Sequence, residues 1–171
     1  EILSEASRAL LRNFDHRFGG FGSAPKFPQS MALGFLLRQQ RRSGNSRELE
    51  AVKLSLDRMA QGGMYDQLGG GFHRYSVDER WLVPHFEKML YDNALLARTY
   101  AEAFQVTQDP FYREITLETL EYLRRDLKHS AGGFFSAEDA DSEGVEGKFY
   151  VWSQDEIETI LGVETAGVFN D

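Results

Sequence analysis

The chain has 171 residues, with 42% apolar and 27% charged residues, which is the length and balance of one folded domain and excludes general disorder. Its net charge is −8, and an acidic surface repels phosphate backbones, which argues against nucleic-acid binding. The absence of cysteine excludes disulfides, thiolate metal sites and thiol catalysis within the chain.

Apolar periodicity and capping signals predict helices separated by loops rich in glycine and aromatic residues. The predicted helices cover residues 3–14, 30–43, 46–61, 86–107, 110–128 and 153–162. We expect N-caps at Ser4, Ser30 and Ser46, and a left-handed glycine at the end of the second helix, at Gly44. Residues 149–152 are predicted as a short strand or extended segment.

The fifth helix carries the clearest start signal. Asp109 before Pro110 combines an N-cap with proline at the first helical position. Within this helix, Leu120 is expected to face the core, and Glu121 and Arg125 are spaced for an ion pair across one turn. The helix from Ser153 is predicted to begin with a capping box.

The loops contain an internal repeat. Gly-Gly-Phe occurs at residues 19–21, 70–72 and 132–134, at intervals of about 50 and 60 residues, each time after a predicted helix. Such a period predicts stacked helical hairpins that bury their faces against one another. We therefore predict an all-α chain, residues 1–171, that forms about three hairpins and half of an (α/α)6 toroid.

Residues 69–93 hold an unusual density of aromatic, basic and acidic side chains. A sugar site needs flat aromatic rings, hydroxyl-binding polar groups, and carboxylates or histidines for proton transfer. The candidates for proton transfer, in this segment and in the acidic loop near residue 140, are His73, His85, Glu87, Asp92, Asp139 and Asp141. The candidates for substrate binding are Tyr75, Arg80, Trp81, Lys88, Tyr91 and Trp152.

These residue types fit two reactions, and structural roles as well. Glycosidases use two carboxylates, about 5.5 Å apart in retaining enzymes and about 6.5–9.5 Å apart in inverting enzymes. Glu87 or Asp92 could form such a pair with Asp139 or Asp141. An epimerase needs a base and an acid on opposite faces of the sugar, for which the histidines are the natural candidates. Taken singly, each residue also fits capping, core packing or a surface ion pair.

No metal or cofactor site is predicted. The acidic segment from Asp139 places Gly144 at the sixth position, as in an EF-hand calcium loop, but its twelfth position is Tyr150 instead of a bidentate glutamate. The chain also lacks a phosphate-binding Gly-Lys-Ser/Thr loop and a Gly-x-Ser-x-Gly nucleophile motif.

Three long motifs resemble one known family. The segments GGFGSAPKFP (residues 19–28), 62–96 and EDADSEGVEGKFYVW (138–152) closely resemble the spermatogenesis-associated, thioredoxin-like protein family. The resemblance implies a thioredoxin-like domain followed by a toroid similar to N-acylglucosamine 2-epimerase and six-hairpin glycosidases. This chain matches the first half of that toroid, so we expect a fragment of a longer protein that lacks the thioredoxin-like part.

Two functions remain open from the sequence. The first is a carbohydrate-active domain, hydrolase or epimerase-like, that binds a sugar in the toroid cavity. The second is a non-catalytic binding or scaffold module that accompanies a thioredoxin-like domain. We expect a cytoplasmic protein without a membrane span, because no apolar run reaches the roughly 18 residues that a spanning helix needs. Half a toroid exposes apolar helix faces, which predicts a homodimer.

Overall fold

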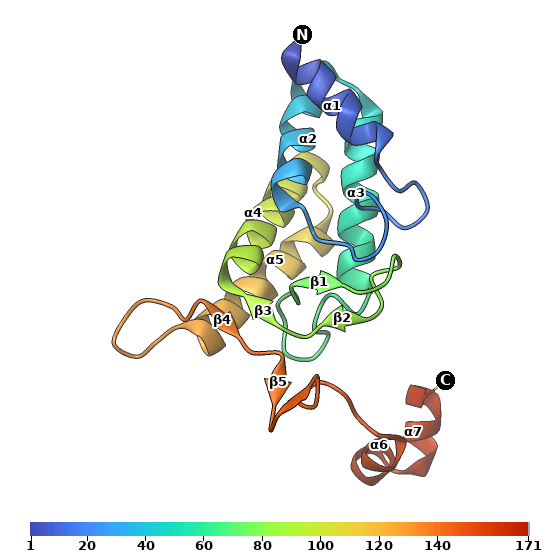
Figure 1. Cartoon of the computed structure of the whole chain (residues 1–171), viewed down its shortest axis with the longest axis vertical. Helices are drawn as coiled ribbons and strands as arrows, with labels where there is room; N and C mark the ends of the chain where they lie inside the picture. Colours follow the sequence, from blue (N-terminus) through green and yellow to red (C-terminus); the bar gives the residue numbers. More distant parts are fainter. Residues whose placement is uncertain (171) are drawn as a thin grey trace. The chain divides into compact units, whose positions relative to one another are not determined.

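The computed structural model describes residues 1–170, which divide into two compact units, residues 1–139 and 140–170 (Figure 1). The helices are α1 (Ile2–Arg12), α2 (Ser30–Ser43), α3 (Ser46–Gln61), α4 (Leu90–Thr107), α5 (Pro110–Tyr122), α6 (Gln154–Leu161) and α7 (Val163–Asn170), with a π-helical turn, η1 (Leu123–Leu127). The strands are β1 (Tyr75–Ser76), β2 (Pro84–His85), β3 (Lys88–Met89), β4 (Ala137–Glu138), β5 (Asp141–Ser142) and β6 (Val145–Glu146). The prediction of a mainly helical chain is confirmed.

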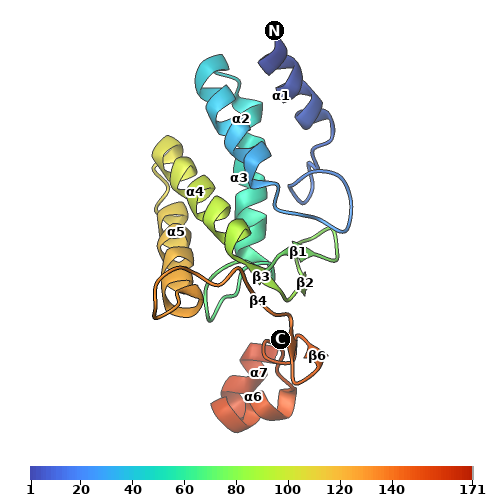
Figure 2. The same ribbon diagram turned by 60° about the vertical axis from the view of Figure 1, so that its left-hand side comes forward.

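The first unit is built from helices that run back and forth. Helices α2 and α3 form one antiparallel hairpin and α4 and α5 form the next, with α2 beside α4 (Figures 1 and 2). Their facing surfaces enclose one apolar core whose fully buried members include Leu33, Leu56, Leu96 and Tyr100. Each Å² of apolar surface that this packing removes from water stabilises the fold by about 25 cal/mol, which is the main stabilising contribution.

The second and third Gly-Gly-Phe loops follow α3 and α5 with η1 and lie at one end of the first unit (Figure 1). The first follows α1 and lies beside α3, where the Gly20 N–H donates to the Ser55 hydroxyl. The short strands of this unit gather at the end where the second and third loops lie. Strand β1 pairs antiparallel with β2, and β3 pairs antiparallel with β4. The helical frame therefore presents a surface of loops and two-residue strands at one end.

Several local signals act as predicted. Gly44 ends α2 in the left-handed conformation, with φ of 70°. Asp109 caps α5 by accepting a hydrogen bond from the Phe111 N–H, and Pro110 is its first helical residue. Ser153 and Glu156 form a reciprocal capping box at the start of α6. These side chains satisfy backbone groups that a helix end leaves without intrahelical partners.

Five details of the predicted helices were wrong. Helix α1 begins at Ile2 with Glu1 at the N-cap position, so Ser4 lies inside the helix instead of capping it. Helix α4 begins at Leu90 instead of residue 86, because residues 84–85 and 88–89 pair in strands. The N-cap of α3 is Asn45, and Ser30 is the first helical residue of α2 instead of its cap. Leu120 is 48% exposed.

The end of the fifth helix also differs from its prediction. The backbone changes to a π-helical turn at Leu123, which rotates the following side chains relative to an α-helix. Glu121 consequently pairs with Arg124, and Arg125 pairs with Asp126.

The second unit is small. Strands β5 and β6 form a hairpin, and α6 and α7 pack against each other. Residues 149–150 form a turn in which the Tyr150 N–H donates to the Gly147 carbonyl, so the predicted strand is absent there. The unit exposes large apolar side chains, among them Phe149, Trp152, Val163 and Phe169. Self-association through exposed apolar faces stays a prediction.

Candidate functional site

The β1–β2 hairpin places a row of rings at the loop end of the first unit. The strand register sets Tyr75 opposite His85, and their rings stack with centroids 4.9 Å apart and planes inclined by 20°. Phe27 lies against Tyr75 with a centroid distance of 4.8 Å and is 46% exposed. We call Phe27, Tyr75 and His85 the aromatic row. Flat, partly exposed rings of this kind can pack against the apolar face of a sugar.

A charged group adjoins the aromatic row. The Arg74 guanidinium donates to the Glu87 carboxylate over 2.7 Å, and the His85 Nε2 lies 3.8 Å from the same carboxylate oxygen. The hydrogen bond that Arg74 donates to Glu87, with a further contribution from Tyr91, raises the pKa of Arg74 above its ordinary value. Glu87 therefore lies between the Arg74 guanidinium and the His85 imidazole.

Asp92 lies in the first turn of α4. Burial raises the pKa of this carboxyl from 3.8 to about 6, although Tyr91 and Arg74 favour the ionised form. Its Oδ2 atom is buried and has no hydrogen-bond partner among the described residues. A carboxyl that titrates close to neutral pH can both donate and accept a proton, which is what general acid–base chemistry requires.

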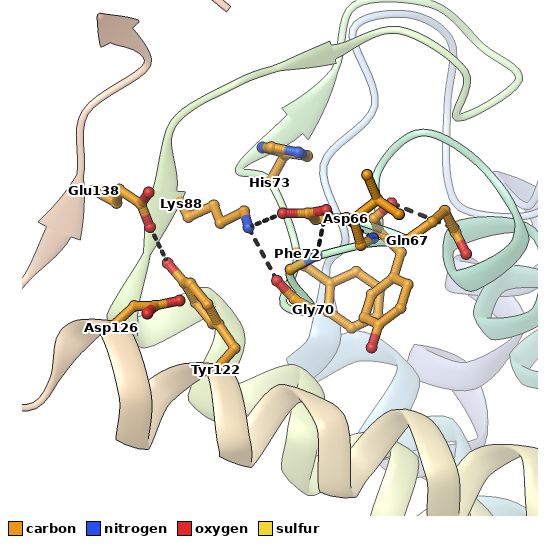
Figure 3. Close-up of polar contacts among 12 residues, drawn as sticks. Asp66, Gln67, Gly70, Phe72, His73, Lys88, Tyr122, Asp126 and Glu138 are labelled. Carbon is orange, nitrogen blue, oxygen red and sulfur yellow. Dashed lines mark hydrogen bonds and ion pairs between the residues drawn. The ribbon is translucent and has the colours of Figure 1, made fainter. Parts of the chain in front are cut away.

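His73 and Lys88 belong to the interior of this region (Figure 3). His73 is 3% exposed, and burial, with the nearby Lys88 cation, lowers its pKa to about 4. Lys88 is 2% exposed and donates to the Asp66 carboxylate over 2.7 Å and to the Gly70 carbonyl over 2.9 Å. The expectation that Lys88 contacts a substrate is therefore corrected, because its ammonium group is already enclosed by the protein.

Trp81 requires the same correction. It has no exposed surface, and its indole N–H donates to the Phe18 carbonyl over 2.9 Å. Stacking on a sugar needs an exposed ring face, so the structure assigns Trp81 to the core, where it joins the β1–β2 hairpin to the first Gly-Gly-Phe loop. The exposed Arg80 lies near the same loop, with its guanidinium 5.7 Å from the Phe18 ring centroid.

The remaining predicted residues lie on other segments of the chain. Tyr91 is 49% exposed at the start of α4, and Asp139 is an exposed residue at the end of the first unit. Asp141 and Trp152 belong to the second unit. The proposed pairing of a carboxylate near α4 with Asp139 or Asp141 stays a prediction.

Sequence reasoning missed several residues that shape this region. Phe27 was not singled out, although it stands in the GGFGSAPKFP motif. Asp15, Lys26 and Asp66 were also missed, although an aspartate precedes the phenylalanine of each of the first two Gly-Gly-Phe motifs by six residues. That shared spacing was the available signal.

A separate groove of about 940 Å³ runs along α1 and α3. Its lining combines apolar residues with Arg8, Arg12, His16 and Arg47. Within residues 1–170, no three His, Asp or Glu side chains are grouped so that they could hold a metal ion. No helix in that range has the length and apolar character to cross a membrane.

Comparison with known proteins identifies relatives along almost the whole chain. No model of a known protein family matches it. Spermatogenesis-associated protein 20 of Homo sapiens is 46% identical over 162 residues, which cover 89% of this chain and 21% of that protein. The Mus musculus protein of the same name is 42% identical over 174 residues, covering 96% and 22%.

The chain is homologous to one segment of spermatogenesis-associated protein 20. The family resemblance seen in the three motifs is confirmed for this segment, which spans about a fifth of the length of those relatives. An uncharacterised protein of Caenorhabditis elegans is 39% identical over 168 residues and shows the same partial coverage, 91% of this chain and 23% of that protein.

Solved structures share the fold at low sequence identity. Cellobiose 2-epimerase from Bacillus thermoamylovorans aligns with a TM-score of 0.70 at 12% identity, over 99% of this chain and 51% of that chain. The cellobiose 2-epimerase of Spirochaeta thermophila gives 0.68 at 22% identity, over 80% and 39%. An unsaturated glucuronyl hydrolase specific for heparin gives 0.66 at 13% identity, over 92% and 46%. The predicted (α/α)6 toroid class is confirmed, and the chain corresponds to part of such a toroid.

Proposed function

We propose that the chain supplies part of a sugar-binding site for a carbohydrate-active domain, hydrolase or epimerase-like. The observation that carries the proposal is the aromatic row beside Glu87 and Asp92, because it combines exposed ring faces with a carboxyl that titrates near neutral pH. The sugar epimerases and glycoside hydrolases among the structural neighbours support the class of ligand.

In this proposal Tyr75 and Phe27 pack against the apolar face of the sugar. Glu87, held by Arg74, accepts hydrogen bonds from hydroxyl groups, and Asp92 and His85 exchange protons with the substrate. The Asp92 carboxyl is protonated in part of the molecules near pH 6 and can act as an acid there. His73, with its lowered pKa, stays neutral under the same conditions.

The test is a thermal-shift screen of the full chain with glucose, mannose and cellobiose. A ligand that binds only the folded state raises the melting temperature by mass action. His85→Ala and Asp92→Asn are expected to abolish the shift, whereas the matched controls His16→Ala and Asp155→Asn should keep it. A shift that survives both site variants, or no shift with any of the sugars, would contradict the proposal.

The two reactions can be separated by following cellobiose with NMR. An epimerase yields a second disaccharide with an inverted centre, and a hydrolase yields two monosaccharides. The proposal does not need the chain to complete either reaction by itself, because it aligns with only about half of the toroid of its structural neighbours.

The proposal also includes a cytoplasmic location, which fractionation of cells would test.

A second candidate is a non-catalytic binding module, and the groove along α1 and α3 favours it. That groove offers exposed arginines over an apolar floor, on helices that carry none of the aromatic row. Binding of a partner through the groove would be weakened by Arg8→Ala and Arg47→Ala together. If this double variant loses a partner and the sugar screen stays negative, the binding module replaces the sugar site as the proposed function.

A further inference from the structure

The first two Gly-Gly-Phe loops are built in the same way. Asp15 accepts hydrogen bonds through Oδ1 from the N–H groups of Arg17 and Phe18, and its backbone pairs with Gly19 and Gly20. Asp66 makes the matching contacts with the N–H groups of Leu68 and Gly69, and with the backbone of Gly70 and Gly71. Each loop is closed by an antiparallel bridge, Phe14 with Phe21 and Tyr65 with Phe72.

A buried lysine completes each loop. Lys26 donates to the Asp15 carboxylate and, over 2.9 Å, to the Gly19 carbonyl. Lys88 donates to the equivalent atoms of the second loop, as described above (Figure 3). The two lysine side chains are 0% and 2% exposed. Burial alone would raise the pKa of Asp15 and of Asp66, but the hydrogen bonds from the loops and the lysines lower both below the ordinary value.

Lys26 is connected directly to the aromatic row. Its backbone N–H and carbonyl both pair with Ser76 in β1, at 2.8 and 2.9 Å. Lys26 is thus fixed at its backbone by β1 and at its ammonium group by the first loop. The next residue, Phe27, then meets Tyr75, the other residue of β1.

Lys88 is connected to the two carboxyl groups of the candidate site, Glu87 and Asp92. Lys88 follows Glu87 directly and pairs with Glu138 through the β3–β4 register. The second loop also binds the start of α4, because the Phe72 N–H donates to the Asn93 Oδ1 over 2.6 Å and the Asn93 amide donates to the Phe72 carbonyl over 2.9 Å. Asp92 therefore lies between two residues that are bound to the second loop, Lys88 and Asn93.

We propose that the two lysines are positioning residues, Lys26 for the aromatic row and Lys88 for Glu87 and Asp92, an inference that rests on the sugar site proposed above. A buried ion pair is often no more stabilising than an apolar pair of the same size, so stability alone does not explain two such pairs. Lys26, which pairs with β1, is held by the first loop, and Lys88, in β3, is held by the second loop. Both contacts lie next to residues of the candidate site. Rigid support of this kind is what a preorganised binding site needs.

The test removes each pair without leaving a lone charge. Asp15→Asn with Lys26→Met, and Asp66→Asn with Lys88→Met, keep the Oδ1 acceptor of each loop and the length of each apolar stem. Two NMR markers are followed in each double variant: the ring-proton shift of His85, which the stacked Tyr75 ring displaces, and the titration midpoint of the Asp92 carboxyl carbon. Neither marker depends on a bound sugar.

We expect each double variant to change its own marker. Loss of the first pair should move the His85 signal toward that of a histidine in the unfolded chain, while Asp92 still titrates near 6. Loss of the second pair should lower the Asp92 midpoint by about one unit as the carboxyl becomes hydrated, with the His85 shift kept. Binding of any sugar found in the screen should weaken about tenfold or more in either variant, since small displacements in a site have effects of that size.

Folded variants in which both markers stay at their wild-type positions would overturn the proposal and leave the lysines with a purely structural role. If a methionine variant fails to fold, Lys26→Gln or Lys88→Gln with the same Asp→Asn change retains a donor to the glycine carbonyl and is read by the same markers. Unmoved markers in a chain that binds sugar overturn only the positioning role. Absence of sugar binding by the unaltered chain overturns the sugar site and the role of the lysines in it.

Discussion

The first two Gly-Gly-Phe loops and the third loop share a backbone pattern but differ in their surroundings. In the third loop His129 takes the place of the aspartate: its Nδ1 accepts from the Ala131 N–H, and its backbone pairs with Gly132 and Gly133. Phe21 and Phe72 are 5% and 0% exposed, whereas Phe134 is 52% exposed. The turn itself thus needs only glycines and one local acceptor, whereas burial of the phenylalanine depends on neighbouring elements.

The buried lysines should give the largest difference between the loops. Lys26→Met and Lys88→Met each leave a partly buried carboxylate without its cation, which is expected to cost about 3 kcal/mol of unfolding free energy. Lys128→Met, in the third loop, is expected to change stability by less than about 0.5 kcal/mol, since surface substitutions rarely do more. Urea unfolding of the three variants measures the difference.

Adding the aspartate-to-asparagine change should restore most of the lost stability in the first two loops, because the lone charge disappears. If Lys26→Met and Lys88→Met unfold at the wild-type urea concentration, the two ion pairs do not hold these loops, and the comparison with the third loop fails.

Glycine-to-alanine substitutions should give a smaller difference in stability between the loops. A Cβ atom at Gly20 would lie 2.5 Å from the Trp81 ring, and one at Gly71 would lie 2.4 Å from the Tyr122 ring, both at positive φ. Alanine there is expected to cost about 2 kcal/mol or more from backbone strain and overpacking. At Gly132, also at positive φ, a Cβ would meet open space, so Gly132→Ala should cost only the strain, about 1 kcal/mol. Equal melting temperatures for Gly71→Ala and Gly132→Ala would show that the second loop is packed less tightly than described.

A pH experiment sharpens the comparison at the start of α4, which the second loop anchors. The pKa of Asp92 is raised from 3.8 to about 6 in the folded state, so its proton is held more tightly there than in the unfolded chain. Its contribution to folding is complete below pH 4 and is lost as the pH rises through 6. Asp92→Asn should therefore be more stable than the wild type near pH 7, by about 1 kcal/mol after allowance for partial solvation.

The advantage of Asp92→Asn should disappear near pH 4, where both side chains are neutral. Chemical denaturation at the two pH values gives the comparison, and Asp155→Asn serves as a control at an exposed helix start. A difference between Asp92→Asn and the wild type that is independent of pH would mean that the carboxyl titrates at its ordinary value.

The smallest expected effect comes from making the third loop resemble the others. His129→Asp supplies a carboxylate in place of the imidazole acceptor, and hydrogen bonds to a charged acceptor are stronger. Because the residue is exposed, the gain should stay below about 1 kcal/mol, and it should vanish in high salt. A clear loss of stability would mean that the imidazole makes contacts in this loop that an aspartate cannot replace.

The sequence predicted the helical frame because its signals are local. Capping at Asp109 and Ser153, the left-handed glycine at Gly44 and the repeated Gly-Gly-Phe motif all act within a few residues. It did not predict β1–β4, because two-residue strands are too short to show alternation.

The roles of Trp81 and Lys88 could not be read from the sequence for a related reason. An aromatic residue and a lysine beside acidic residues suit a sugar site as well as they suit the interior. Their burial depends on contacts with Phe18 and Asp66, which are 63 and 22 residues away. Site composition was therefore visible from the sequence, but the division into exposed and buried members was not.

The distance along the chain between aspartate and lysine has a consequence for how this fold can vary. Lys26 follows its aspartate by 11 residues and Lys88 follows its aspartate by 22, yet each ammonium group donates to the equivalent pair of oxygen atoms in its own loop, the aspartate Oδ2 and a glycine carbonyl. The segment between Tyr75 and His85 folds out from the second loop as a hairpin and returns to it. The second loop therefore contains 11 more residues between aspartate and lysine than the first, and the buried Trp81 holds these extra residues against the first loop, so two different chain lengths end in the same arrangement of aspartate, glycine and lysine.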